Sequence, residues 1–96
     1  MRRRHDIRLA PEAATELRSL PAHVRARIMN AIERHLRTEP AKVGGKKKLL
    51  VLDDGRAIWQ LRIGDYRVFF EVDIDEPLVV LKQVRKKGRK TTGEIR

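Results

Sequence analysis

The sequence contains no cysteine, and this absence excludes several classes of site. Without cysteine the chain cannot form a disulfide framework, offer a thiol nucleophile or hold a zinc–thiolate centre. Its three histidines, His5, His23 and His35, lie far apart and lack the spacing of metal ligands. We therefore expect no bound metal ion and no other cofactor.

Long hydrophobic runs are also missing. No segment approaches the roughly 20 consecutive apolar residues that cross a bilayer. Residues 1–6 are mostly charged and lack the apolar segment of a signal peptide. We therefore expect a cytoplasmic protein that does not bind a membrane. A chain of 96 residues can fill one hydrophobic core, so residues 1–96 are predicted to form a single domain.

Acidic residues are too few to balance the basic ones. The chain has 23 lysines and arginines against 13 aspartates and glutamates, which gives a net charge of +10. Such a field attracts polyanions, and binding through phosphates weakens steeply with salt. The most basic segments lack the interleaved large apolar residues of a membrane-surface helix. Nucleic acid, including ribosomal RNA, is the favoured partner class, and an acidic protein partner is compatible with the same charge.

Proline positions and apolar spacing predict two helices in the first half of the chain. Alternation at residues 6–9 predicts a short strand before them. Pro11 suits the first turn of a helix, and Pro21 separates this helix from a second one that ends before Pro40. The second helix has an apolar stripe made of Val24, Ile28, Ala31, Ile32 and His35 or Leu36. Two such helices need a flat apolar surface to cover.

The second half alternates with the period of strands. Residues 58–63, 66–73 and 78–84 are predicted strands, and the first two are joined by a turn at Gly64 and Asp65. The apolar residues 49–52 leave two interpretations open, a short hairpin strand or a capped loop. The predicted fold is therefore α+β in the order β-α-α-β-β-β, with both helices on one face of a mainly antiparallel sheet. Residues 91–96 form a short terminal helix or stay mobile.

Several of these features occur together in one known group of proteins. A strand, two helices broken at Leu20 and Pro21, a lysine-bearing loop and the sequence LRIGDYR at residues 61–67 resemble the RelE/ParE superfamily of toxins. This resemblance implies a type II toxin–antitoxin system, in which an acidic antitoxin wraps the toxin and forms a hetero-oligomer with it. RelE-like members cut mRNA on the ribosome, whereas ParE-like members inhibit DNA gyrase. A binding module without toxicity is a third possibility.

Cleavage of the RelE type needs no metal, because the 2′-hydroxyl of the RNA attacks the adjacent phosphate. The protein must then supply a proton acceptor, a proton donor and cations for the developing charge. The resemblance implies Arg67, which matches the strand arginine of the family, together with Arg62 and Lys87 as catalytic residues. The alternative for Arg67 is a solvated arginine or one that is ion-paired with Glu71.

Other basic and polar residues are predicted to bind RNA by contacting its phosphates. They are Lys46, Lys47, Lys48, Gln60, Arg85, Lys86, Arg89 and Lys90, and the alternative for both basic runs is a solvated loop or tail. Phe69 should face outward, where it could stack on a base or pack against an antitoxin helix.

One departure from the family concerns the proton-transfer group. Many RelE-like enzymes have a tyrosine in the terminal segment, but this chain has Gly93 near that position and no tyrosine after Tyr66. A lysine of the terminal cluster, Glu71 or His5 could take over this role. His23 and His35 lie on the predicted helices, and we expect both of them to be structural.

Overall fold

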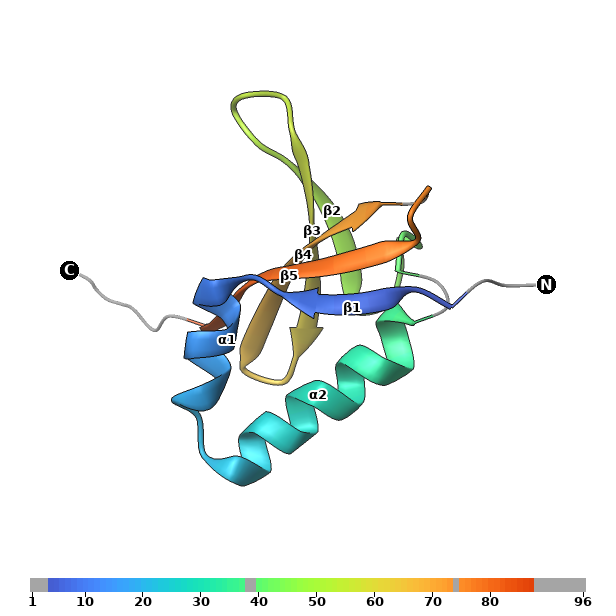
Figure 1. The fold of residues 1–96 in the computed structure, drawn as a ribbon. Coiled ribbons are helices and arrows are strands. Elements are labelled where there is room, and N and C mark those ends of the chain that lie inside the picture. Colours follow the sequence, from blue (N-terminus) through green and yellow to red (C-terminus); the bar gives the residue numbers. More distant parts are fainter. Residues whose placement is uncertain (1–3, 38–39, 74, 88–96) are drawn as a thin grey trace.

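The computed structural model describes residues 4–37, 40–73 and 75–87 and shows an α+β fold, as predicted. Two helices follow the first strand, and the rest of the described chain builds a sheet (Figure 1). The elements are β1 (Asp6–Leu9), α1 (Pro11–Arg18), α2 (Ala22–Leu36), β2 (Lys47–Val51), β3 (Ala57–Ile63), β4 (Tyr66–Asp73) and β5 (Leu78–Lys86). No helix among these residues is long and apolar enough to cross a membrane.

The sheet has the strand order β1-β5-β4-β3-β2. Only the pair of β1 and β5 is parallel, so the prediction of a mainly antiparallel sheet is confirmed. Residues 49–52, whose state the sequence left open, fall largely within β2, where Leu49 pairs with Trp59 of β3. The β2–β3 hairpin extends well beyond the helices (Figure 1), and Val51 near its end is 74% exposed.

Both helices cover the same face of the sheet, as predicted, and the core lies between the two layers (Figure 1). The alternation in β3 and β4 turns Leu61, Ile63, Val68 and Phe70 inward. Trp59 stacks on Phe70 with ring centroids 6.2 Å apart. The remaining core residues are Ala13 and Leu17 of α1, Ile28, Ile32 and Leu36 of α2, and Val79, Leu81 and Val84 of β5. The side chains that alternate outward from the core lie on the opposite face of the sheet.

Helix α1 lies beside β5 beyond the end of the pairing between β5 and β1. β1 pairs with β5 only as far as Leu81, so the backbone of β5 beyond that residue lacks a strand on this side. The carboxylate of Glu16 accepts a hydrogen bond from the N–H of Val84 at 2.7 Å. It also lies 3.5 Å from Nε of Arg85, whose Nη2 is 3.1 Å from the carboxylate of Glu12. Glu16 of α1 therefore satisfies the backbone N–H of Val84 at this edge, and both glutamates pair with the side chain of Arg85.

Candidate nucleic-acid interface

Arginines form a row across the outward face of the sheet. Arg62 of β3 is the direct partner of Arg67 of β4, and Arg67 is the direct partner of Arg85 of β5. Side chains directly opposite each other across antiparallel strands have Cβ atoms about 4.5–5.5 Å apart, and like charges at this distance are destabilising. Like charges therefore face each other at Arg62 and Arg67, where a bound polyanion would relieve their repulsion.

Arg67 is held by the turn that precedes its own strand. Its Nη1 donates to the carbonyl oxygens of Gly64 at 3.3 Å and Tyr66 at 3.2 Å. Within the described part of the chain no ion pair joins it to Glu71 or to another carboxylate. The guanidinium group is thus oriented by neutral carbonyls and has no carboxylate partner among the described residues.

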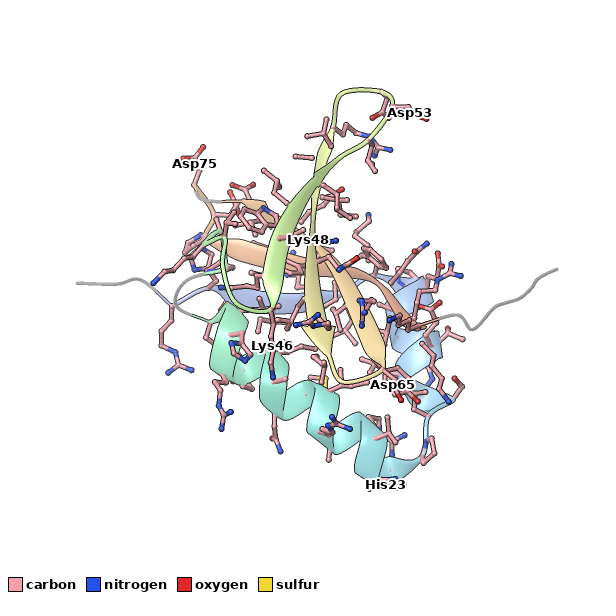
Figure 2. The ribbon with its side chains drawn as sticks, turned by 180° about the vertical axis from the view of Figure 1, so that it is seen from behind. His23, Lys46, Lys48, Asp53, Asp65 and Asp75 are labelled. Carbon is pink, nitrogen blue, oxygen red and sulfur yellow. The ribbon has the colours of Figure 1, made fainter. Side chains whose placement is uncertain are left out.

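A shallow hollow of about 160 Å³ lies beside this row, and we call it the sheet hollow. Lys48 and Gln60 face each other across β2 and β3 on the same side of the sheet as Arg62 and Arg67. Figure 2 shows Lys48 on β2, with Lys46 nearer to α2. The lining includes six of the residues predicted from the sequence, Lys46, Lys47, Lys48, Gln60, Arg62 and Arg67. The structure thus brings the first basic run together with the two predicted catalytic arginines.

Lys47 has a different environment from the lysines on either side of it. It is buried, and its register partner is the inward-facing Leu61. Its Nζ donates to the carbonyl oxygen of His35, near the end of α2, at 3.1 Å. A lysine there satisfies one of the carbonyl groups that a helix leaves unpaired at its C-terminus and complements the helix dipole. We therefore assign Lys47 to holding α2 on the sheet.

The basic residues at the end of β5 also differ from one another in their environments. Arg85 is paired with the carboxylates of α1, which neutralise much of its charge. Lys86 is the partner of Tyr66 and so alternates away from the arginine row. Lys87 is exposed, and its N–H bonds to the carbonyl of Asp65 at 2.5 Å, which places it beside the turn that holds Arg67. Arg89, Lys90, Gly93 and the predicted terminal helix lie outside the described residues.

The other candidates for proton transfer, Glu71 and His5, do not line the same hollow as Arg67. Glu71 is on the same strand face but pairs with Val80 and borders a separate hollow beyond Phe69. His5 precedes β1, whose start pairs with Leu78 at the far end of the sheet. Neither residue lines the sheet hollow. Phe69 faces outward, as predicted, between Gln60 and Gln83 of the neighbouring strands.

His35 is the histidine whose environment is perturbed most clearly. Its partial burial lowers its pKa below the ordinary value of 6.5, and the positive charges of Lys47, Arg34 and Lys46 lower it further. The folded protein therefore binds a proton at His35 less readily than the unfolded chain does. Stability from this source is complete above pH 6.5 and is lost as the pH falls below that value.

This pKa shift predicts that stability decreases as the pH is lowered from about 7.5 to about 5.5, two values on either side of the ordinary pKa of histidine. The urea concentration at the midpoint of unfolding should therefore fall over this range. His35→Gln should make the fall smaller. Glu33 and Asp54 do not confuse the test, because hydrogen bonds from Arg37 and Arg56 lower their pKa values from 4.5 and 3.8. His23→Gln is the matched control, and an equal effect of both substitutions would contradict the assignment to His35.

Comparison with known proteins identifies the family of the chain. The sequence profile of the family described as phage-derived protein Gp49-like (DUF891) matches residues 15–94. The chain belongs to this family. The Gp49-like family is itself RelE-like, so the resemblance to RelE-like proteins seen in the sequence is confirmed. No curated protein sequence matches the chain.

Solved structures show the same fold at low sequence identity to this Gp49-like protein. The toxin–antitoxin complex RelBE2 from Mycobacterium tuberculosis matches with a TM-score of 0.76 and 22% identity, over 88% of this chain and 93% of that one. The RelE–RelB complex from Pyrococcus horikoshii gives 0.67 and 20%, over 90% and 98%. The isolated RelE toxin of E. coli gives 0.56 and 20%, over 90% and 87%. The RelE-like fold is therefore shown.

Proposed function

We propose that this Gp49-like protein is the toxin of a type II toxin–antitoxin system and cuts mRNA on the ribosome in the cytoplasm. The observation that carries the proposal is the pair of Arg62 and Arg67, directly opposite each other on the outward face and lining one hollow. Neutral carbonyls hold Arg67, so its charge is available to a phosphate. The family membership and the fold support the same function.

The proposed reaction is a transesterification within the RNA. The 2′-oxygen forms a bond to the adjacent phosphorus, and the bond from phosphorus to the 5′-oxygen breaks. The 2′-hydroxyl proton passes to water, and the 5′-oxygen takes up a proton. Arg67 binds two oxygens of the phosphate through its planar guanidinium group, and Arg62 adds a second charge. Lys87, beside the turn that holds Arg67, stabilises or protonates the departing oxygen. No metal ion or other cofactor takes part in this scheme.

The described residues of the sheet hollow fit a mechanism dominated by positive charge. Its lining offers guanidinium, ammonium and amide groups and no carboxylate or imidazole. Fixed donors aimed at developing negative charge are the largest contribution in many enzymes, and alignment of the attacking oxygen contributes as well. Binding in the ribosome would supply that alignment, which fits cleavage that depends on the ribosome.

An acidic antitoxin is the protein partner that we propose. The net charge of +10 calls for an acidic chain, and neither Arg62 nor Arg67 has an acidic partner within residues that the structure describes. The M. tuberculosis structure is of the toxin–antitoxin complex RelBE2, and the P. horikoshii structure is of a RelE–RelB complex. Covering the sheet hollow would block RNA, so one contact would explain both assembly and neutralisation.

The function can be tested by pulse labelling after induced expression in a bacterial host. Incorporation of amino acids and of thymidine is followed separately, with an empty vector as the control. We expect protein synthesis to fall first and cuts to appear in translated mRNA. An earlier fall in thymidine incorporation would instead indicate gyrase inhibition. If neither rate changes, the protein is a binding module without toxicity.

A further inference from the structure

A second and larger hollow lies between α2 and the end of the sheet where β3 turns into β4. Its volume is about 540 Å³, and we call it the α2 hollow. Polar side chains reach it from α2 and from the sheet. They include Arg27, Asn30 and Arg34 of α2, Lys46 before β2, and Arg62 of β3. Figure 2 shows Lys46 at the base of β2, close to α2.

The charge of the α2 hollow is not neutralised. None of its described lining residues is acidic. Arg27, Arg34 and Arg62 form no ion pair with any described residue. Among the described residues, ion pairs join Arg37 to Glu33, Arg56 to Asp54, and Arg85 to Glu12 and Glu16, and none of these arginines lines the hollow. The α2 hollow thus brings three unpaired arginines to one space that has no acidic residue among its described lining.

The side chain of Arg27 lies against the turn on the opposite wall. Gly64 has a φ of +56°, and a Cβ atom at this residue would come within 3.1 Å of Cζ of Arg27. The guanidinium group of Arg27 therefore occupies the space that a larger residue in the turn would fill.

The two hollows share a wall. Lys46 and Arg62 line both of them, and the N–H of Arg62 donates to the carbonyl of Lys46 at 2.9 Å. The apolar lining of the α2 hollow is limited to two alanines and Ile63, which is only 6% exposed. A helical peptide needs large apolar anchors, whereas a phosphodiester chain needs cations and donors. The chemistry of this hollow suits the phosphodiester chain.

We propose that the α2 hollow binds the backbone of the RNA strand next to the phosphate held in the sheet hollow. This inference rests on the proposed function, because it takes RNA as the ligand of the shared wall. The strand crosses between the hollows at Lys46 and Arg62 and then runs along α2. Arg27 and Arg34 are separated by about 10.5 Å along the helix axis, at 1.5 Å per residue, so they contact different phosphates. Asn30 lies between them as a neutral donor.

The salt dependence of RNA binding tests this proposal. The probe is a short single-stranded RNA with 2′-O-methyl groups, which cannot be cut, and binding is followed by fluorescence anisotropy from about 50 to 200 mM salt. Each phosphate contact contributes about 0.7 to the slope of log K against log salt. We expect Arg27→Gln and Arg34→Gln each to reduce the slope by about 0.7, and the double variant to reduce it by about 1.4. Glutamine is a good helix former, so α2 should remain folded.

Arg18→Gln is the matched control, because Arg18 is an exposed helix arginine outside both hollows and its loss changes the net charge equally. A double variant with the slope of this control would overturn the inference. So would a double variant that binds polyglutamate more weakly but RNA normally, since the hollow would then be a protein site. A reduced slope without ribosomal cleavage by the wild type would support the inference and contradict the proposed catalysis.

Discussion

Replacing Arg67 by alanine should lower the rate of mRNA cleavage on the ribosome by about 100- to 1,000-fold, the usual effect of removing one donor that stabilises developing charge. The reason is positional. Arg67 stands in the middle of the arginine row, and its guanidinium is oriented by two carbonyl groups without being neutralised. Single-turnover cleavage of a ribosome-bound message is the measurement. Protein synthesis after induction should recover in parallel.

Two further variants distinguish the loss of a specific phosphate contact from a general loss of positive charge. Arg67→Lys keeps the charge but loses the planar, two-pronged contact, so its rate should fall between those of wild type and Arg67→Ala. Arg56→Ala removes an arginine that is paired with Asp54 in the β2–β3 hairpin, and it should cleave at nearly the wild-type rate. A rate for Arg67→Ala within a few-fold of that of Arg56→Ala would remove Arg67 from the catalytic centre.

The central part of the fold could be predicted because one face of its strands is buried. In β3 and β4 a period of two places every second residue in the core, and a shift by one residue would expose the whole apolar set. This constraint determined that Leu61 and Val68 are inward and that Arg62 and Arg67 are outward, and the register confirms it. The shared outward face of the two arginines therefore followed from the local sequence, whereas their direct pairing comes from the register.

Elements formed through long-range pairing were harder to predict. β2 gains its strand conformation from backbone bonds to β3, and its outer end exposes Val51, so no alternation marks it. In β5 the register shifts opposite Phe69 and Phe70, which leaves Lys82 as an extra residue. Such a bulge lets Leu81 and Val84 both point inward, against simple alternation.

The roles of individual cations depended on partners that are distant in sequence. Lys47 looks like its neighbours in the chain, but the carbonyl of His35 and a buried position give it a structural role. Arg85 resembles Arg67 in its strand, yet two glutamates of α1 pair with it. The helix side of the α2 hollow could have been recognised from the sequence, because polar residues recur at positions 23, 27, 30 and 34 along one side of the helix.

Two adjacent phenylalanines should differ sharply in their effect on stability. Phe70 is fully buried against Trp59, and Phe70→Ala should cost about 3–5 kcal/mol, as removal of a core aromatic does. Domains of this kind are stable by about 5–15 kcal/mol, so this single change removes much of the total. Phe69 is half-buried on the outward face, and Phe69→Ala should cost at most about 1.5 kcal/mol.

Urea unfolding of both variants measures this difference, and Phe70→Leu provides a milder change in case Phe70→Ala does not fold. The leucine variant should lose less than about 1.5 kcal/mol, because it keeps most of the apolar volume. Equal losses at the two positions would mean that β4 does not have the register described here. That register also places Arg67 beside Arg62, so a failure of this test would remove the geometric basis of the proposed active site as well.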